Sequence, residues 1–379
     1  MPTIGIDCRL AGLKHAGIGR YVANLVSRLP KLDSQINWVL FFSDSEQAQE
    51  VLPNNQDIPL IKIIFAPIKH YSLAEQVQLP TIFNQEKLDL LHVPHFNVPW
   101  FYKGKTVITI HDLLWHEYRG LNATTLSPWK YSVKYFGYRQ IVTHAVKNAE
   151  KILVPAETIQ QTLSKFYPNL AHKIVVTKEG VDQRLLSQKN QTNTQSNPTA
   201  HSEQHVLLYV GSLYPHKNLQ LVIDALAELK EYQLWIVGTR NAFQERVQKY
   251  VQEKQLEGRV KFWGRVSDQK LSELYQQAEA LVQPSLSEGF GLTGIEAMAA
   301  DVPVLASNIP IFREIYQDAA LFFDPKSSAD FVVALSRLRQ LSLPEKQELS
   351  RKRKSLSQQY SWDKMAAQTL VVYKQVLGF

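Results

Sequence analysis

The sequence contains almost no cysteine, because Cys8 is the only one in 379 residues. This excludes an intrachain disulfide and fits a reducing compartment. The sequence also lacks an uninterrupted apolar run near the ~20 residues that span a bilayer. The N-terminus shows no secretory signal, since Arg9, Lys14 and Arg20 break up the stretch after the first strand-like segment. We therefore expect a cytoplasmic protein that does not cross a membrane.

The composition also lacks the marks of disorder. Hydrophobic residues make up 45% and charged residues 20%, as in globular proteins. The length favours two domains. A net charge of +7 leaves nucleic acid, an anionic membrane surface and anionic substrates open as partners. Because no helix-turn-helix pattern, zinc-knuckle spacing or RNP-like motif is present, we expect no nucleic-acid partner.

Short β-rich segments alternate with amphipathic stretches, a pattern typical of βα units around a parallel sheet. In the first half the strand candidates are Thr3–Asp7, Trp38–Phe42, Ile61–Ala66, Leu88–Val93, Thr106–His111, Lys151–Pro155 and Ile174–Thr177. In the second half they are His205–Gly211, Gln233–Gly238, Val260–Trp263, Ala280–Gln283, Val302–Ala306 and Ala320–Phe323. The helix candidates are Ile18–Leu32, Lys217–Lys230, Asn241–Gln255, Asp268–Gln277, Thr293–Ala300 and Ser361–Leu377. The pattern predicts two doubly wound α/β domains, which bind ligands at the carboxyl ends of their strands.

A polar stretch divides the chain. Residues 187–204 (SQKNQTNTQSNPTAHSEQ) contain almost nothing apolar to bury, so we interpret them as a solvated linker. The linker separates an N-terminal domain, residues 1–186, from a C-terminal domain, residues 205–360. The closing helix, within residues 361–379, is assigned to the N-terminal domain.

The most informative motif is residues 287–300 (SEGFGLTGIEAMAA). Glu288 and Glu296 stand at E-x7-E spacing across a glycine-rich bend that opens a helix. The glycines let a ligand approach the backbone, and the first N–H groups of a helix form an anion site. A carboxylate at Glu296 can accept two sugar hydroxyls, as acidic residues do for ribose in dinucleotide folds. The alternative is a helix-capping acid and an unrelated surface acid.

This stretch resembles the E-x7-E signature of glycosyltransferase family 4, a retaining group with the two-domain GT-B fold. The resemblance covers essentially the whole chain and is greatest for the bacterial mannosyltransferase branch. Further matching segments are Asp7-x-Arg9, residues 17–21 (GIGRY), residues 111–113 (HDL), residues 180–182 (GVD), residues 211–218 (GSLYPHKN) and residues 284–291 (PSLSEGFG). The resemblance implies two facing Rossmann-like domains, an interdomain cleft and a C-terminal helix that returns to the first domain.

The resemblance also implies roles for residues of the C-terminal domain. Glu296 would hold the ribose hydroxyls of a nucleotide sugar. Glu288 would hold the donor sugar and its diphosphate, together with the backbone of four residues, Gly289, Phe290, Gly291 and Leu292. Lys217 would neutralise the departing diphosphate, which gains negative charge in the transition state. Taken alone, Lys217 fits a solvated residue at a helix start equally well.

Two positions in this domain depart from the family pattern. Ser212, a donor-loop residue, and His216 stand where many relatives have arginine. Lys217 would then have less cationic help on the diphosphate, unless Arg265 or Arg20 supplies it.

In the N-terminal domain the resemblance implies a second set of donor contacts. Gly17 and Gly19 lie between the first strand and a helix, so their N–H groups would meet the phosphates. Arg20 would join that clamp or simply be solvated. His111 would orient the sugar at its reactive face, and Asp112 would orient the imidazole or approach the acceptor hydroxyl. The alternative for His111 is a hydrogen-bonded histidine at a strand end.

Asp268 bears on which nucleotide the protein binds. It occupies the loop that reads the base in relatives, and a carboxylate fits the N1 and N2 edge of guanine, so GDP-mannose is the leading donor, ahead of UDP-linked hexoses. Asp268 would equally cap the helix that starts there. His92-x-x-His95 suggests a metal, but Pro94 at a strand end argues against helical ligand spacing. We expect no metal and no cofactor beyond the nucleotide sugar.

The acceptor is expected to be a glycan or a lipid-linked glycan. Residues 128–139 (PWKYSVKYFGYR) interleave aromatic and basic side chains, which fits peripheral contact with the inner face of an anionic membrane. The alternative is a helix packed on the sheet with solvated lysines. The resemblance favours attack on the face that the diphosphate leaves, with domain closure about residues 182–204. Rival interpretations are an epimerase of the same fold and a binding scaffold without turnover.

Overall fold

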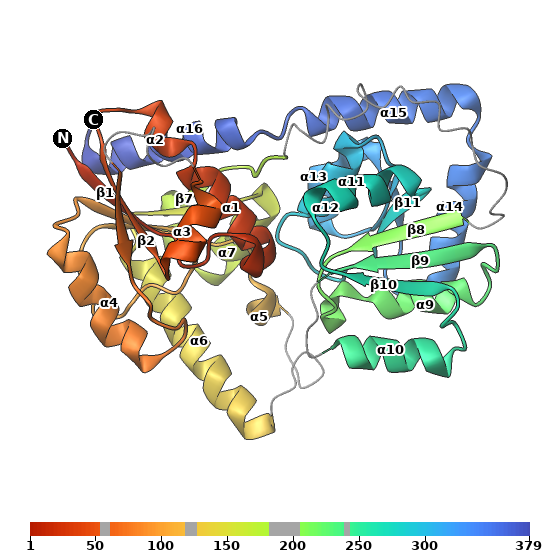
Figure 1. Ribbon diagram of the computed structural model, residues 1–379, viewed down its shortest axis with the longest axis horizontal. Coiled ribbons are helices and arrows are strands. Elements are labelled where there is room, and N and C mark those ends of the chain that lie inside the picture. Colours follow the sequence, from red (N-terminus) through yellow and green to blue (C-terminus); the bar gives the residue numbers. More distant parts are fainter. Residues whose placement is uncertain (54–60, 118–126, 182–204, 239–242) are drawn as a thin grey trace. The chain divides into compact units, whose positions relative to one another are not determined.

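The computed structural model describes residues 1–53, 61–117, 127–181, 205–238 and 243–379, which form two compact units (Figure 1). The first unit consists of Met1–Leu113, Pro128–Gly180 and Ser361–Phe379. The second consists of Leu114–Ser127 and Val181–Tyr360. The predicted linker, residues 187–204, lies outside the described residues, as does Asp182. Every predicted strand segment forms a strand.

The first unit contains a parallel seven-stranded sheet with the order β3-β2-β1-β4-β5-β6-β7. Its strands are β1 (Thr3–Asp7), β2 (Asn37–Phe42), β3 (Ile61–Phe65), β4 (Leu90–Val93), β5 (Thr106–Thr109), β6 (Lys151–Val154) and β7 (Ile174–Val176). The strand order reverses between β1 and β4, and open α/β sheets bind ligands at such a switch point.

The helices of the first unit differ in one place from the prediction. The predicted helix over residues 18–32 is two helices, because Pro30 at the start of the second lacks the N–H that would continue the first. The helices are α1 (Ala16–Val26), α2 (Leu29–Leu32), α3 (Ser45–Val51), α4 (Leu73–Gln85), α6 (Pro128–Asn148), α7 (Glu157–Phe166) and α16 (Trp362–Leu377), with short 3-10 turns at Leu13–His15 and Pro168–Lys173.

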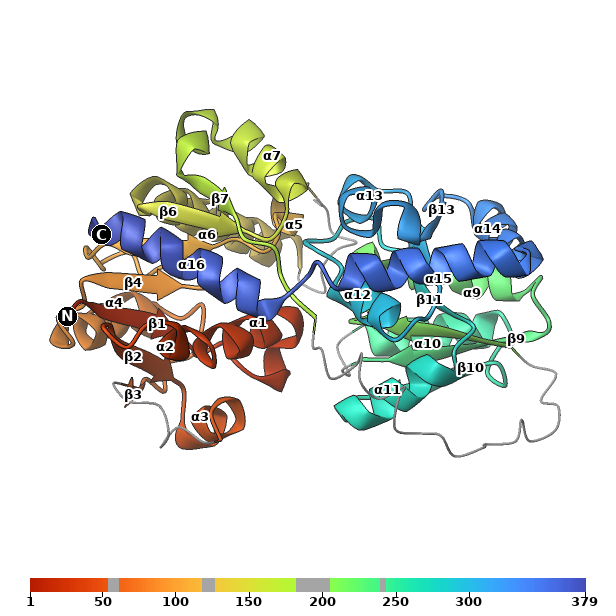
Figure 2. The same ribbon diagram turned by 90° about the horizontal axis from the view of Figure 1, so that it is seen from above.

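The C-terminal helix α16 belongs to the first unit, as predicted, and packs against α1, α2 and β6 (Figure 2). Its Tyr373 hydroxyl lies 2.5 Å from His92 Nδ1 inside the core. Gly180 makes the close approach of the chain to α16 feasible, because a Cβ there would lie 2.1 Å from the backbone nitrogen of Trp362. The glycine of the GVD segment is therefore needed for packing.

The second unit contains a parallel six-stranded sheet with the order β10-β9-β8-β11-β12-β13. Its strands are β8 (His205–Val210), β9 (Tyr232–Val237), β10 (Val260–Gly264), β11 (Ala280–Gln283), β12 (Val304–Ser307) and β13 (Leu321–Phe323). Its helices are α5 (Leu114–Glu117), α9 (Leu219–Leu226), α10 (Gln244–Glu253), α11 (Asp268–Gln277), α12 (Leu292–Ala299), α13 (Pro310–Tyr316), α14 (Ser328–Gln340) and α15 (Leu343–Ser357), with 3-10 turns at Pro215–Lys217 and Gln317–Ala319.

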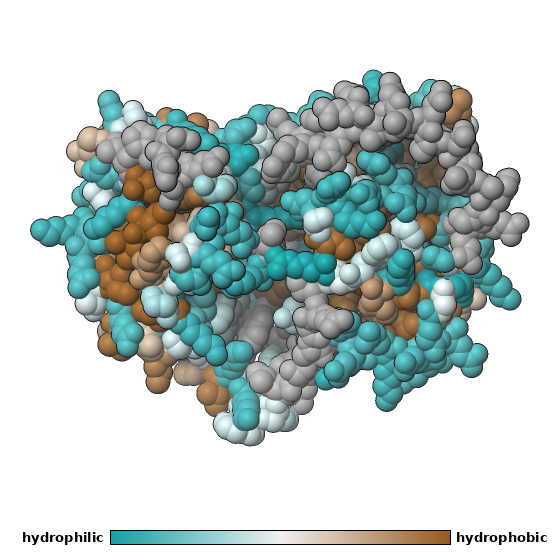
Figure 3. Space-filling model, viewed as in Figure 1, coloured by the Kyte–Doolittle hydropathy of each residue, from teal (hydrophilic) through white to brown (hydrophobic). Residues whose placement is uncertain are grey.

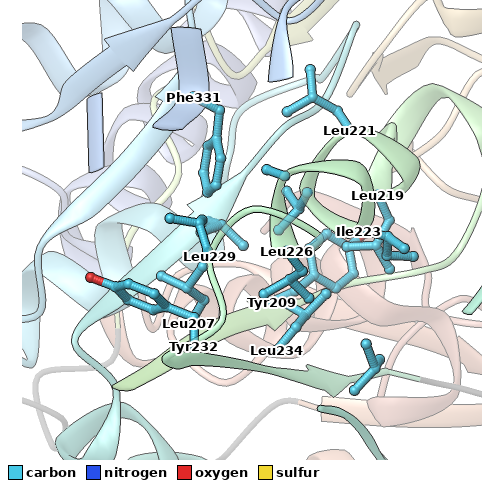
Figure 4. Packing of buried hydrophobic residues seen from close by; sticks show 14 of the residues in the cluster. Leu207, Tyr209, Leu219, Leu221, Ile223, Leu226, Leu229, Tyr232, Leu234 and Phe331 are labelled. Atoms are coloured by element: carbon cyan, nitrogen blue, oxygen red, sulfur yellow. The ribbon is translucent and has the colours of Figure 1, made fainter. Parts of the chain in front are cut away.

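The core of the second unit lies between the sheet and the helices α9 and α14. Leu207, Leu226 and Leu234 are fully buried there, and Phe331 of α14 packs into the same cluster (Figure 4). Parallel strands covered on both faces require such continuous apolar segments. The rigid layer holds the strand ends, from which the loops of the candidate site project.

Candidate active site

In the second unit the strand order reverses between β8 and β11, and the loops after these two neighbours carry the predicted donor residues. Lys217 follows β8 and Glu288 follows β11. Their side chains meet, with Lys217 Nζ 2.5 Å from Glu288 Oε1. Ser285 also donates a hydrogen bond to Glu288 Oε1 at 2.9 Å. The structure therefore brings together two residues that are 71 positions apart.

The two loops are tied to each other by hydrogen bonds. Asn218 lies in the left-handed region at φ 55°, where asparagine is better tolerated than most residues. Its side-chain amide donates to the carbonyls of Pro284 (3.0 Å) and Pro325 (2.8 Å). The N–H of Leu286 donates to the carbonyl of His216 at 2.8 Å. Lys217 thus lies in a 3-10 turn that ends at Asn218, and not in the first turn of a helix as predicted.

The electrostatics of this cluster favour a paired ammonium and carboxylate. Burial opposes ionisation of Glu288, but the Lys217 ammonium outweighs it, so the pKa of Glu288 is lowered. Burial, with help from Lys217, lowers the pKa of His216 to about 4. His216 is therefore neutral near pH 7. It supplies no positive charge where relatives carry arginine, so the departure noted in the sequence is a real loss of charge.

The glycine-rich bend is shaped by Tyr316, a residue that sequence reasoning missed. Gly291 is the N-cap of α12 at φ 96°, and no side chain caps the helix. The Tyr316 hydroxyl lies 2.7 Å from the Gly291 carbonyl oxygen and also contacts Gln283 Oε1, so its single proton is shared between these two acceptors. A Cβ at Gly291 or at Gly294 would lie 2.3 Å from the Tyr316 hydroxyl. These two glycines therefore make room for a tyrosine ring, and the uncapped N–H groups of α12 remain suited to an anion.

The other predicted donor residues of the second unit lie in the glycine-rich bend, on α12 and in the loop after β8. Phe290 is buried against Tyr360, with ring centroids 5.5 Å apart, so only its backbone is available to a ligand. Glu296 is buried on α12. Ser212 lies in the loop after β8, where its carbonyl accepts a hydrogen bond from the Tyr209 hydroxyl at 2.5 Å. Gly289 and Leu292 flank Phe290 and Gly291 in the half-buried bend.

Asp268 does not cap α11. The N-cap is Ser267, whose hydroxyl accepts from the N–H of Lys270 at 3.2 Å, while Asp268 is the first helical residue. The alternative in which Asp268 caps this helix is therefore wrong, because the preceding residue, Ser267, is the cap. A sequence signal was present, because serine is a preferred N-cap and acidic residues favour the first turn. The role of Asp268 at the base stays a prediction.

In the first unit the predicted glycine loop lies inside α1, not before it. Gly17, Gly19 and Arg20 all belong to this helix, so only its first N–H groups lack helical partners. A Cβ at Gly19 would lie 1.9 Å from the carbonyl oxygen of Gly12, whose own N–H donates to Gly19 O at 3.2 Å. Gly19 is thus required for the approach of the preceding loop. Phosphate contact by this helix stays a prediction.

His111 lies two residues beyond the end of β5, and both of its ring nitrogens have partners. Nδ1 lies 3.1 Å from Glu179 Oε1, and Nε2 lies 3.2 Å from the carbonyl oxygen of Pro94. The edge of the Tyr21 ring packs against the imidazole at 4.7 Å between centroids. Sequence reasoning missed Glu179, although it directly precedes the conspicuous GVD segment. Asp112 follows His111 and is half-buried.

His92 of the His92-x-x-His95 pair is held in the core through both of its ring nitrogens. His92 Nδ1 contacts the Tyr373 hydroxyl, and Nε2 lies 2.8 Å from Thr109 Oγ1. Burial lowers the pKa of His92 to about 3, so the ring is neutral. Within the described ranges no group of three or more His, Cys, Asp or Glu side chains could hold a metal ion.

In the same ranges, none of the helices has the length and hydropathy of a membrane span.

Family models match both halves of the chain. The model described as Glycosyltransferase Family 4 matches residues 15–185, and the model described as Glycosyl transferases group 1 matches residues 190–356. The chain belongs to glycosyltransferase family 4. The O-antigen chain mannosyltransferase RfbU of Salmonella typhimurium is 28% identical over 73% of this family 4 chain and 72% of that protein. The O-antigen chain mannosyltransferase B of Escherichia coli is 26% identical over 94% of this chain and 96% of that protein.

A solved structure confirms the fold of this glycosyltransferase. A glycosyltransferase from Rickettsia africae is similar over 99% of this chain and 98% of its own, with a TM-score of 0.74 and 19% identity. The two parallel-sheet domains of the family 4 chain therefore have the GT-B fold. The protein is an enzyme that transfers a sugar, and the epimerase interpretation is not favoured.

Proposed function

We propose that this glycosyltransferase moves mannose from GDP-mannose to a hydroxyl of a glycan or a lipid-linked glycan, with retention at the sugar carbon. The observation that carries the proposal is the Lys217–Glu288 pair beside the uncapped start of α12. The names of the two bacterial relatives support mannose as the sugar. Asp268, at the start of α11 shortly after β10, supports guanine as the base.

Lys217 and the α12 N-terminus supply the positive charge that a diphosphate needs. Before a donor binds, Glu288 neutralises the Lys217 ammonium at 2.5 Å. In our proposal the diphosphate takes over the ammonium, and Glu288 is released to accept a hydroxyl of the donor sugar. Because Lys217 changes its partner from Glu288 to the diphosphate, donor binding is coupled to the orientation of the sugar. The exchange leaves no additional buried charge without a partner.

The proposed chemistry needs no covalent enzyme intermediate. The bond between the sugar carbon and the phosphate oxygen breaks, and the diphosphate leaves with the electron pair. The acceptor oxygen forms the new bond on the same face, while its proton passes to a phosphate oxygen. The protein contributes orientation and stabilisation of the developing charge.

His111 is suited to holding a position rather than to moving a proton. Its two ring nitrogens face a carboxylate oxygen of Glu179 and the carbonyl of Pro94. An N–H directed to a sugar hydroxyl would have to leave one of these acceptors. We therefore assign His111 to shaping the sugar-facing wall of the first unit, with Glu179 fixing its ring.

A membrane contact is proposed for α6, whose first turns project beyond the sheet of the first unit (Figure 1). Trp129, Val133 and Phe136 are 66%, 67% and 66% exposed, and their spacing places them on one helix face. Lys130 and Lys134 are exposed beside them. The packed-helix alternative holds for the second half of α6 only, where Val142, Ala145 and Val146 are buried.

Hydrophobic side chains also gather on the face of the first unit seen in Figure 3. An interfacial helix of this kind presents apolar residues to the acyl boundary and lysines to anionic lipid. A lipid-linked acceptor would meet the first unit at such a surface. Co-sedimentation with phosphatidylglycerol vesicles, compared between wild type and the double variant Trp129→Ser and Phe136→Ser, tests this contact.

The donor is tested with a thermal-shift and turnover panel of nucleotide sugars. GDP-mannose is expected to raise the melting temperature of the wild type, and the shift should be weaker in Lys217→Ala and Glu296→Ala. Lys249→Ala is the matched control, because Lys249 is 78% exposed and pairs only loosely with Glu253 at 3.9 Å. A larger shift with a UDP-hexose would replace the proposed donor. No shift with any nucleotide sugar would contradict the donor site itself.

A transfer assay distinguishes a glycosyltransferase from an epimerase or a binding scaffold. Incubation with GDP-mannose and a lipid-linked glycan extract should release GDP in amounts that depend on the extract. Acceptor-independent release alone, or formation of an epimerised nucleotide sugar, would contradict transfer.

A further inference from the structure

A small pocket lies at the strand-order switch of the first unit, where β1 and β4 are neighbours. Asp7 ends β1, while Pro94, His95 and Asn97 follow β4, and His70 enters from the loop before α4. The free space inside the pocket is about 10 Å³, close to what one water-sized group needs. None of the residues that the proposed donor site uses lines it.

Three polar side-chain atoms of this pocket have no hydrogen-bond partner within the described part of the chain. They are His70 Nε2, His95 Nδ1 and Asn97 Oδ1. His95 is only 8% exposed and Asn97 only 2%. Buried polar groups are almost always paired, so three such atoms around one pocket indicate a polar occupant from outside the chain. Together they offer an imidazole nitrogen from each of two histidines and an amide oxygen that accepts.

The charges around the pocket select against an anion. Arg9 donates to both oxygens of Asp7, at 2.9 and 2.7 Å, and to Glu75 Oε1 at 2.8 Å. Its Nη1 donates to the carbonyl of Ile68 at 3.0 Å. Each guanidinium nitrogen thus already has an acceptor in the chain, and the one cation is shared by two carboxylates. A phosphate or carboxylate group would meet Asp7 and Glu75 at close range, whereas a neutral hydroxyl would not be repelled.

An exposed aromatic ring stands beside the same pocket. Tyr71 is 60% exposed and its backbone lies in the left-handed region at φ 60°, which is rare for a tyrosine. The N–H of Tyr71 donates to Glu75 Oε2 at 2.7 Å, and this bond holds the strained turn. The ring centroid lies 6.1 Å from that of His95 and 6.2 Å from that of His70. Strain that keeps an aromatic ring in solvent next to unpaired polar atoms indicates a binding role.

We infer that this pocket binds one hydroxyl group of the acceptor sugar, whose ring lies against Tyr71. A pyranose offers both parts of this match, an apolar ring face and a neutral polar edge. Because the pocket has space for only one water-sized group, it takes a single hydroxyl, and the rest of the sugar stays outside it. The inference rests on the proposed function, since an acceptor sugar is the substrate left for the first unit.

The pocket is also connected to His111. The carbonyl of Pro94, a lining residue, accepts from His111 Nε2 at 3.2 Å. A sugar held by His95 and Asn97 would therefore lie beside the wall that His111 forms. His70, His95 and Tyr71 would determine which acceptor sugar is accepted, because only an edge with a correctly directed hydroxyl satisfies all the unpaired atoms.

Two variants test the pocket without depending on the same structural change. Tyr71→Gly removes the ring and relieves the left-handed backbone, so it should fold at least as well as the wild type. His95→Phe fills the pocket and removes the unpaired nitrogen. His172→Gln is the control, since His172 is exposed in the turn before β7. Melting temperatures confirm that each variant is folded.

Binding is measured by saturation-transfer NMR on the full chain without nucleotide, using the methyl α-glycosides of mannose, galactose, glucose and rhamnose. At least one glycoside should bind the wild type and the control, with affinity about five- to tenfold lower in both pocket variants. Mannose 6-phosphate should bind more weakly than methyl mannoside. Glycerol should give no comparable signal, because it has no ring to lie on Tyr71.

Three results would overturn the inference. They are no glycoside binding, equal binding to the wild type and both pocket variants, or preference for the phosphorylated sugar. The donor panel is independent of this measurement. If GDP-mannose fails to stabilise the protein while a glycoside binds in a Tyr71-dependent manner, the donor assignment fails and the sugar pocket stands. If GDP-mannose binds and no glycoside does, only the pocket fails.

Discussion

The ammonium of Lys217 lies 2.5 Å from Oε1 of Glu288, within a cluster formed by the loops after two neighbouring strands. The cation that would meet a departing diphosphate is therefore held by a carboxylate of the same site. Burial alone would raise the pKa of Glu288, but the neighbouring Lys217 ammonium lowers it, so the carboxylate stays ionised. In the proposed mechanism, this pair is the state from which donor binding starts.

Glu288→Gln should separate diphosphate affinity from turnover. Without the carboxylate, Lys217 is no longer neutralised, so GDP should bind tighter by about two- to tenfold. Transfer should fall by about a hundredfold or more, because the sugar loses an orienting acceptor. Calorimetric titration with GDP and a turnover assay measure the two effects. Glu253→Gln, which removes an exposed partner of Lys249, should change neither. Weaker GDP binding in Glu288→Gln would show that the pair does not compete with the diphosphate.

Tyr316→Phe should loosen the glycine-rich bend. The variant loses the hydrogen bonds to the Gly291 carbonyl and to Gln283, at a cost of about 1–3 kcal/mol in stability. We expect a higher KM for the donor with a smaller change in kcat, measured with the nucleotide sugar that stabilises the wild type. Tyr250→Phe is the control, because its hydroxyl contacts Asp224 away from the bend. An unchanged donor KM would limit Tyr316 to a role in folding.

Gly19→Ala should destabilise the first unit by several kcal/mol. Its Cβ would lie 1.9 Å from a backbone oxygen of Gly12, which no side-chain rotation can relieve. Gly137→Ala is the matched comparison, since no atom of the described residues lies within 4 Å of its Cβ position inside α6. That change should stabilise by about 0.5–1 kcal/mol through helix propensity. Urea unfolding of both variants decides the matter, and equal effects would refute the close approach.

Acidification should destabilise the protein through its buried neutral histidines. Burial lowers the pKa of His92 to about 3 and that of His216 to about 4. Below their ordinary value of about 6.5 the unfolded chain binds protons that the folded chain does not, so stability falls as the pH drops from there towards 3. His92→Gln should reduce the slope of unfolding free energy between about pH 7 and about pH 5, while His172→Gln should not. A slope that does not change in His92→Gln would contradict a neutral buried His92.

The strand and helix candidates came from patterns that depend on neighbouring residues. Segments such as Val302–Ala306 are apolar because parallel strands are buried on both faces, and periodicity alone marks them. The family motifs likewise placed Lys217 and Glu288 near a nucleotide sugar. Helix boundaries were predicted less well where a single residue determines them. Pro30 divides one predicted helix, and the next predicted helix begins only after Asn218.

The sequence by itself determined the two-domain α/β architecture, because this depends on local periodicity. The family and the main charged residues of the candidate site followed from the resemblance of short motifs to glycosyltransferase family 4. Only the tertiary structure decided which distant side chains contact each other. The contact of His111 with Glu179 spans 68 positions, and the contact of Arg9 with Glu75 spans 66. Such partners carry no local signal, since they meet only when strand order brings distant loops to one edge of a sheet. The same packing decided that Gly19 and Gly291 make room for protein atoms, and that the polar atoms beside Tyr71 have no partner among the described residues.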